Sequence, residues 1–364
     1  MHALDLASGN EKFNGPVEIS ASVAGTGYDS SNSVVTFDSR MENQRAALAL
    51  VNGVVYLAWA SHENADPYHG WVIGYNAGNL SQTTAYCTTA NGHKGGVWMA
   101  GGGPAADSSG NVYVSTGNGG FDDTVSNLGD TILKLSTTAG LAVSDWFTPF
   151  DQSTLESQDL DLGSGGVVLL PDQISGPAHL MVGGGKEGAL YLLNRDSMGH
   201  FCSSCNTTTG DNNVVQSFHA IRAIFGTPAF WQNGLYLGGV SDKLSLFRFN
   251  PATGLFDSSP ASQSSLIYGF PGATPSISSQ ASSNGIVWAI DSSQFGVPKN
   301  AGGPAVLHAY DANDLETERW NSLQAPGNRD QAGQAVKFTV PTVANGRVYI
   351  GTQTTVEVYG LLPN

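Results

Sequence analysis

Positive charge is scarce in this chain of 364 residues. It has 15 Lys and Arg against 30 Asp and Glu, which gives a formal net charge of −15, and its basic residues form no cluster. Such an acidic chain repels phosphate backbones, so we expect no nucleic-acid partner. No apolar run approaches the roughly 20 residues that cross a bilayer, and no basic or apolar leader follows Met1. We therefore expect no membrane partner and no signal peptide in this chain.

Cysteine is also scarce, because three residues are too few for a disulfide scaffold or a four-cysteine zinc site. Cys202 and Cys205 enclose two serines, and Cys87 stands alone. His200 and His219 lie close enough in the sequence to complete a Cys₂His₂ zinc site with that pair. We favour the alternative, which is a local disulfide or two unpaired thiols in a surface loop.

Glycine and short β-type segments are abundant instead. The chain has 46 glycines and only 12% charged residues, which fits short strands joined by tight turns. One unit recurs along the chain. It begins with a small apolar run, continues with Asn-Gly or Ser-Gly, and ends with a strand that contains Tyr. Its clearest copies are residues 49–58, 106–118, 227–239 and 340–352. One such unit cannot bury its own apolar face, so stacked copies must share a core, as in a ring of four-stranded blades.

The sequence therefore predicts an all-β chain, with one β-propeller domain over residues 1–364 and six or seven four-stranded blades. The segments expected to form blades are 46–89, 96–150, 164–196, 226–260 and 273–322, and 338–360 is expected to form the inner part of a further blade. We expect residues 10–20 to pair beside 338–360, so that strands from both termini close the last blade. A seventh blade would need strands within residues 17–45. An incomplete blade with unpaired strands would instead favour a homodimer.

Several stretches resemble the quinoprotein, or pyrroloquinoline quinone (PQQ) dehydrogenase-like, propeller superfamily. Residues 2–9 (HALDLASG) are similar to its ALD-x-x-TG strand and turn, and residues 308–312 (HAYDA) are a weaker copy. Residues 184–196 (GGKEGALYLLNRD) are similar to its K-x-G-x-x-Y-x-L-D-R run. Most telling is GGVW at 95–98, followed by NVY at 111–113 and TGN at 116–118.

The resemblance implies a role for two residues. Trp98 would lie beneath the plane of a quinone, and Asn118 would be a calcium ligand. The position that matches the family's catalytic aspartate is Ser136, which cannot act as a general base. The resemblance also implies a location outside the cytoplasm, in the periplasm or secreted.

The densest group of polar residues lies in the turn at 61–71 (SHENADPYHGW). His62 and His69 titrate near neutral pH, and the carboxylates of Glu63 and Asp66 bind hard cations. We interpret His62 and His69 as candidate acid–base residues, and Glu63 and Asp66 as candidate ligands of a divalent metal, most simply calcium. A hydrogen-bonded polar loop at a blade edge is the alternative.

Two further groups are candidates for the same site. Asp159 and Asp161 stand at alternate positions before an apolar strand, so we expect their carboxylates on one face, sharing a cation or a proton. Lys186 and Glu187 follow three glycines at a strand end and could face the channel. Arg45 could bind a carboxylate or phosphate of the substrate there. Solvated aspartates, a surface ion pair and a surface arginine remain the respective alternatives.

Three functions follow from these residues, all centred on the funnel of the propeller. We favour metal-assisted hydrolysis of small esters, lactones or phosphoesters, in which His62 or His69 moves the proton. A PQQ-dependent alcohol or sugar dehydrogenase is the alternative that the resemblance implies. A non-catalytic binding or scaffold propeller is the third, because fold does not determine function.

Overall fold

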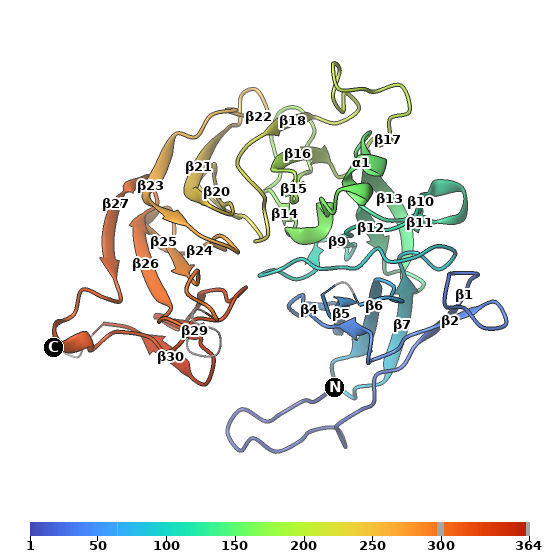
Figure 1. The fold of residues 1–364 in the computed structure, drawn as a ribbon, viewed down its shortest axis with the longest axis horizontal. Coiled ribbons are helices and arrows are strands. Elements are labelled where there is room, and N and C mark those ends of the chain that lie inside the picture. The colour runs from blue at the N-terminus through green and yellow to red at the C-terminus, as the bar shows by residue number, and fades with distance from the viewer. Residues whose placement is uncertain (64, 297–301, 362–364) are drawn as a thin grey trace. The chain divides into compact units, whose positions relative to one another are not determined.

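The structure is a computed structural model that describes residues 1–63, 65–296 and 302–361, and its regular structure is almost entirely β (Figure 1). The chain divides into two compact units. Unit 1 consists of Met1–Leu169 and Arg195–Val214, and unit 2 consists of Leu170–Asn194 and Val215–Asn364. The all-β expectation is confirmed, and the single domain expected over residues 1–364 stays a prediction.

Unit 1 contains two blade-type sheets. The first has the order β3–β5–β6–β7, with β4 also paired to β5. Its strands are β3 (Glu42–Asn43), β4 (Ala49–Val51), β5 (Val54–Ser61), β6 (Trp71–Asn76) and β7 (Gln82–Cys87). The second has the order β17–β13–β12–β9–β8, in which only the pairing of β13 with β17 is parallel. Its strands are β8 (Ala105–Ala106), β9 (Val112–Ser115), β12 (Ile132–Ser136), β13 (Ala142–Thr148) and β17 (His200–Phe201).

Shorter elements complete unit 1. Two-stranded sheets pair β1 (Ser22–Ala24) with β2 (Val34–Thr36), and β10 (Phe121–Asp122) with β11 (Asn127–Leu128). The remaining elements are the helix α1 (Gln152–Ser157), the 3₁₀ turns η1 (Asp123–Val125) and η2 (Leu162–Ser164), and the strand β14 (Val168–Leu169).

Unit 2 contains the strands of four further blades, all antiparallel. The first has β15 (Leu180–Gly184), β16 (Ala189–Asn194) and β18 (Gln216–His219). The second has β19 (Ala229–Trp231), β20 (Gly234–Gly238), β21 (Asp242–Asn250) and β23 (Ser262–Tyr268), with β22 (Leu255–Phe256) beside β21. The third has β24 (Ser276–Gln280), β25 (Ser283–Asp291), β26 (Val306–Asp311) and β27 (Asp314–Asn321). The fourth has β28 (Thr342–Ala344), β29 (Arg347–Gly351) and β30 (Val356–Tyr359), and the turn η3 (Pro326–Asn328) precedes it.

The turns of the repeat explain why these segments form hairpins. Asn52 and Gly53 have φ of 49° and 79°, so they form the primed turn whose twist suits the flanking strands β4 and β5. Asn345 and Gly346, with φ of 49° and 71°, do the same between β28 and β29. At the third copy the turn falls on Gln232–Asn233, one residue before the Asn-Gly pair, and the following glycine is already paired in the sheet.

The expectation of propeller blades is confirmed, with six in the described residues, two in unit 1 and four in unit 2. Residues 17–45 form the two-stranded sheet β1–β2 and the short β3, so no seventh four-stranded blade lies there. The blade expected at 164–196 is longer, because its third strand, β18, follows the loop 197–213. The expected pairing of residues 10–20 with 338–360 joins different units and stays a prediction.

Each unit has its own apolar core. In unit 1 the core is aromatic: the ring of Phe37 meets those of Trp59 and Trp71 edge to face, at 5.2 and 6.0 Å between centroids. Unit 2 has three clusters of buried Leu, Val, Ile, Phe and Tyr side chains. No helix within the described residues is long and apolar enough to cross a membrane.

Candidate functional site

Asn118 is the centre of the candidate site in unit 1. It follows β9, where backbone hydrogen bonds from Gly117 to Gly96 (2.9 Å) and from Gly95 to Asn118 (2.7 Å) hold two segments together. Its backbone N–H donates to Asp161 Oδ1 at 2.8 Å, and its Nδ2 donates to Asp159 Oδ1 at 2.9 Å. The side-chain Oδ1 is buried and has no hydrogen-bond partner among the described residues. An oxygen acceptor is therefore held beside two carboxylates.

Asp159 and Asp161 reach Asn118 from a turn that precedes β14, as their position before an apolar strand led us to expect. Asp159 follows α1 and has φ of 58°, in the left-handed region, and Asp161 precedes η2. The expectation that both carboxylates face the same way holds at Asn118, although the left-handed residue produces it in place of strand alternation. Gly117 makes the approach possible, because a Cβ there would collide with Asp161 Oδ1.

Trp98 lies next to these residues. Backbone hydrogen bonds hold the residues on both sides of Trp98. The N–H of Val97 donates to Trp59 O at 2.9 Å, and the N–H of Met99 donates to Gly163 O at 3.0 Å. A Cβ on Gly117 would lie 2.8 Å from its Cδ1. The side chain is only 7% exposed, and its indole Nε1 has no hydrogen-bond partner within the described part of the chain.

Arg45 covers one face of Trp98. The guanidinium carbon is 5.4 Å from the ring centroid, which is a cation–π contact. Tyr68 meets the same indole edge to face at 6.3 Å. Burial lowers the pKa of Arg45, and the charges of Asp161 and Glu63 oppose that shift. The sequence candidates Arg45, Trp98 and Asp161 therefore belong to one site.

Asp130 is a member of this site that sequence reasoning missed. It is fully buried before β12, and its Oδ1 accepts from the backbone N–H of Leu162 at 3.1 Å. Burial raises its pKa well above the ordinary value, and the nearby charge of Asp161 adds to the shift. Ser136 is the last residue of β12, six positions after Asp130, and its hydroxyl donates to Thr138. The carboxylates of the site therefore come from other positions than Ser136, which matches the position of the family's catalytic aspartate.

His69 is held in a separate network. Its Nδ1 is 2.9 Å from Thr89 Oγ1, and that hydroxyl donates to the backbone oxygen of Lys94 at 2.7 Å, so Nδ1 carries a hydrogen. Its Nε2 is 2.9 Å from Asp29 Oδ1, and this contact needs a proton between the two atoms. Burial lowers the pKa of His69, and the bond to Asp29 opposes the shift.

Glu42 belongs to the same network and was also missed. The side chain is buried and accepts the N–H groups of Asp38 (2.8 Å) and His69 (3.4 Å). Burial raises the pKa of its carboxyl group to about 7, and the two hydrogen bonds only partly oppose the shift. The sequence signal is weak, because an acidic residue in a short β segment is usually exposed.

The structure does not bring the polar turn 61–71 together as one acid–base group. His62 is exposed, whereas His69 is fully buried. Glu63 is exposed with φ of 58°. Asp66 accepts from the hydroxyl of Tyr28 at 2.9 Å and lies 3.8 Å from Lys94 Nζ. The described residues hold no group of three or more His, Cys, Asp and Glu side chains placed to bind a metal.

Lys186 and Glu187 lie in unit 2, in the turn between β15 and β16. Lys186 Nζ is 5.8 Å from the centroid of the Phe225 ring, and Glu187 Oε2 accepts from Tyr191 at 3.5 Å. Their part in one funnel with the residues of unit 1 stays a prediction.

Cys202 and Cys205 form a disulfide, which confirms the local pairing and corrects the zinc alternative. The two imidazoles have other partners. His200 lies 3.0 Å from Asp145 Oδ1 and stacks on Trp146, and His219 Nδ1 contacts the backbone oxygen of Gly188 at 3.3 Å.

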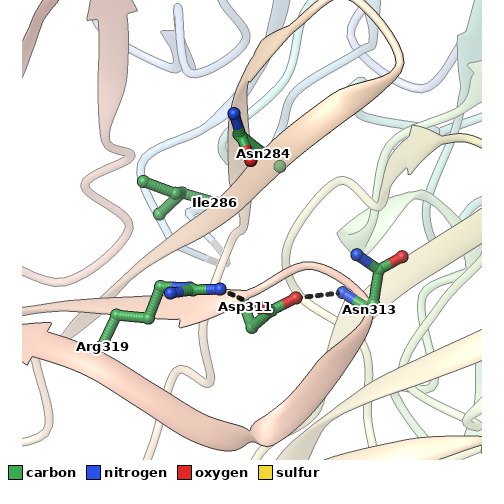
Figure 2. A pocket seen from close by; sticks show the side chains of 6 residues that line it. Asn284, Ile286, Asp311, Asn313 and Arg319 are labelled. Atoms are coloured by element: carbon green, nitrogen blue, oxygen red, sulfur yellow. Dashed lines mark hydrogen bonds and ion pairs between the residues drawn. The ribbon is translucent and has the colours of Figure 1, made fainter.

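Unit 2 has a small polar cavity of about 260 Å³. Figure 2 shows its side chains Asn284, Ile286, Asp311, Asn313 and Arg319. Arg319 forms an ion pair with Asp311, and the N–H of Asn313 donates to the same carboxylate at 2.8 Å. Because the charges are already paired, this cavity is a weaker candidate than the Asn118 site.

No protein-family model matches this chain, and no curated protein matches it. Solved structures do. A quinohemoprotein alcohol dehydrogenase from Pseudomonas putida is 14% identical with a TM-score of 0.46, over 87% of this chain and 57% of that one. The corresponding enzyme from Comamonas testosteroni is 15% identical with a TM-score of 0.48, over 96% and 59%. BamB from Moraxella catarrhalis is 12% identical with a TM-score of 0.43, over 89% and 86%.

This chain thus spans less than two thirds of the length of either dehydrogenase. The likeness concerns the fold alone, at 12–15% identity. The structural neighbours of this chain include quinohemoprotein alcohol dehydrogenases and BamB.

Proposed function

We propose that this chain binds a small, oxygen-rich molecule through a divalent cation, most simply Ca²⁺, at Asn118, Asp159 and Asp161. One observation carries the proposal: the buried Oδ1 of Asn118 lacks a hydrogen-bond partner among the described residues, although the same residue contacts both carboxylates. A buried acceptor without a partner is costly. A hard cation would satisfy it, and carboxylate and amide oxygens are the ligands that Ca²⁺ prefers.

The small number of protein ligands favours binding of a further molecule. Ca²⁺ takes six to eight oxygens, whereas the site offers one amide and two carboxylate side chains. The described residues contain no group of three or more His, Cys, Asp and Glu side chains that could hold a metal ion. Water or a ligand would supply the rest. A hydroxyl, carboxylate or phosphate of a small molecule supplies such oxygens, which accounts for the proposed ligand class.

The contacts of the two histidines do not support the hydrolysis that the sequence favoured. A proton carrier must reach the reacting group. The two ring nitrogens of His69 face Thr89 and Asp29, and His62 is exposed at the end of β5. We therefore propose binding as the function of the site and assign no hydrolytic step.

The quinone that the resemblance implies does not fit the site in this arrangement. Trp98 and Asn118 do lie close together, as the resemblance requires, but the indole is only 7% exposed and Arg45 covers one of its faces. A flat cofactor would have to displace that guanidinium to stack on Trp98. A location outside the cytoplasm remains part of the proposal, and the disulfide Cys202–Cys205 supports it, because such bonds persist in oxidising compartments.

Calorimetric titration of chelator-treated protein with CaCl₂ tests the proposal. We expect one site per chain, and at least tenfold weaker binding in Asp159→Asn, which keeps an acceptor for Asn118 but removes one charge. Asp123→Asn is the matched control, because Asp123 is an exposed carboxylate of the same unit. No heat of binding in the wild type, or equal affinity in Asp159→Asn and the wild type, would reject the calcium site.

A further inference from the structure

The last sheet of unit 2 has an edge without a neighbour. It has the order β28–β29–β30, whereas the sheet of β19–β23 has five strands and the sheet β24–β25–β26–β27 has four. Within the described residues, β30 pairs only with β29. Its side chains Val356 and Val358 are 69% and 46% exposed. Such an edge presents unpaired backbone groups that can pair with another strand.

An apolar groove runs beside this edge. It has a volume of about 710 Å³, and β25, β26, β27, β29 and β30 all contribute to its lining. Its floor includes Trp288 and Trp320, and the ring of Tyr359 meets Trp320 edge to face at 5.6 Å. Leu361, at its rim, is fully exposed. Aromatic and aliphatic side chains so placed form a pocket for the apolar side chains of an added strand.

The charge of the groove differs from that of the whole chain. Its lining includes Arg319, Arg329 and a single carboxylate, Asp330, although acidic residues are twice as numerous as basic ones overall. Arg329 lies 2.7 Å from Asp330, and Arg319 pairs with Asp311. Both arginines of the groove are therefore already paired, and carboxylates of an added strand would join these ion pairs rather than meet an unpaired positive charge.

Unit 1 carries a hairpin with the complementary features. Residues 2–13 fold back on themselves through a bridge between Leu4 and Glu11 and a hydrogen bond from Lys12 to Ala3 (2.7 Å). Leu4 is 56% exposed, and Leu6, in the turn, is fully exposed. Asp5 and Glu11 are the acidic residues of the hairpin, and Lys12 is its one Lys or Arg. An isolated hairpin of two strands is only marginally stable in water, so a third strand beside it would be stabilising.

We propose that the hairpin of a second copy of this chain adds to β30, and that the exchange is reciprocal. Leu4 then packs in the groove, and the carboxylates of the hairpin lie near Arg329. A single chain leaves Leu4, Val356 and Val358 exposed to solvent, whereas two copies that exchange hairpins cover both sets of side chains. Each chain donates one hairpin and accepts one, which makes a closed dimer with twofold symmetry.

Light scattering after size exclusion is the first test. The full chain is expected at twice its mass of 37.9 kDa, with dissociation on dilution. Val358→Lys places a charge on the edge and should weaken the dimer at least 100-fold. Val125→Lys is the matched control, because Val125 is 42% exposed in unit 1. A monomeric wild type at high concentration, or an unchanged dimer in a folded Val358→Lys variant, would overturn the proposal.

Cross-linking identifies the strand that fills the edge. The single variants Leu4→Cys and Val358→Cys are mixed and oxidised, so that only a contact between copies can join them. We expect a covalent dimer from this mixture, and none from Leu4→Cys mixed with Ile174→Cys, which is equally accessible because Ile174 is fully exposed in unit 2. The double variant Leu4→Cys/Val358→Cys distinguishes exchange between copies from a contact within one chain. If it closes mainly within one chain, its own hairpin fills the edge and the exchange between copies is rejected.

Discussion

Unit 1 and unit 2 consist of the same kind of blade but differ in what they bury. All the carboxyl groups that are buried in the described residues belong to unit 1. They are Glu42, Asp130, Asp161 and Asp211. The buried polar side chains of unit 2 are Ser, Thr and His side chains, such as Ser245, Thr274 and His308. Burial of a charge is costly, so a unit that keeps several buried acids does so for a reason other than packing.

The raised pKa values of carboxyl groups follow the same division, whereas lowered values occur in both units. Burial raises the pKa of Glu42 to about 7 and that of Asp211 to about 6. In unit 2, hydrogen bonds from Ser262 and Thr317 lower the pKa of Asp314, and a hydrogen bond from Arg329 lowers that of Asp330. Perturbed acids concentrate at functional sites. The comparison therefore favours unit 1 over unit 2 as the location of the candidate site.

The largest effect is expected from the apolar packing of unit 2. Phe247 is fully buried between two strands and contacts Phe218 at 5.9 Å between ring centroids. Phe247→Ala should lower the free energy of unfolding by about 3–5 kcal/mol. Ile267→Ala, in the same sheet but 59% exposed, should change it by less than about 0.5 kcal/mol. Urea denaturation measures the unfolding free energy of both variants. Similar losses of unfolding free energy in the two would contradict the conclusion that buried apolar packing stabilises unit 2.

The next effect is a dependence of stability on pH that originates in unit 1. The carboxyl group of Glu42 keeps its proton up to a pKa of about 7 when folded but loses it near its ordinary value of 4.5 when unfolded. The folded state therefore binds more protons between these values, so the stability contribution is full below pH 4.5 and is lost as the pH rises to about 7. The expected loss is on the order of 3 kcal/mol.

Glu42→Gln isolates this contribution. The variant should have a flatter profile of unfolding free energy between pH 4.5 and 7 than the wild type, and the two profiles should run parallel above pH 7. The pKa of Asp211 is also raised, so this group too makes the unfolding free energy fall as the pH rises. The informative quantity is therefore the difference between the profiles of the wild type and Glu42→Gln. Parallel profiles over the whole range would mean that Glu42 titrates normally.

A smaller effect should follow from filling the space beside Asn118. A Cβ on Gly117 would collide with Asp161 Oδ1 and lie 2.8 Å from Trp98 Cδ1. Gly117→Ala should cost about 1–3 kcal/mol of stability and weaken Ca²⁺ binding at least tenfold. Gly351→Ala is the control, because its nearest neighbour would be 3.8 Å away. Unchanged Ca²⁺ affinity in Gly117→Ala would separate Asp161 from the proposed site.

Much of the fold could be predicted from local chemistry. The Asn-Gly pairs at 52–53 and 345–346 form the expected turns, because both residues adopt positive φ. The expected bounds 164–196 made this blade too short, because its third strand, β18, comes after the loop 197–213, which belongs to unit 1. No local pattern reveals that a strand resumes after so long an interruption.

The site could be predicted only in part. The family resemblance indicated Trp98 and Asn118, and the alternate spacing of two aspartates indicated Asp161; the structure brings the three together at Gly117. Asp130 and Glu42 were missed, since what distinguishes them is burial by residues distant in the sequence. The two histidines of the turn 61–71 were grouped by proximity in the sequence, whereas burial separates them.

The smallest effect should come from the disulfide of unit 1. Cys202 and Cys205 are three positions apart, so the bond closes a loop of only four residues. Chain-entropy reasoning gives such a loop at most about 2 kcal/mol. Cys202→Ala/Cys205→Ala should therefore lower the Tm slightly and leave the fold intact, as thermal denaturation by circular dichroism would show.

Other contacts explain why the loss should be so small. The segment Arg195–Val214 is held to unit 1 by the stacking of His200 on Trp146 and by the hydrogen bond of 2.8 Å from Phe150 to Asp211. Thiol titration supplies the control. Burial raises the pKa of Cys87 to about 12, so only two thiols should react after mild reduction of the native protein. A loss of unfolding free energy far above about 2 kcal/mol would mean that the disulfide, and not these contacts, holds the segment in place. A third reactive thiol would mean that Cys87 is not buried.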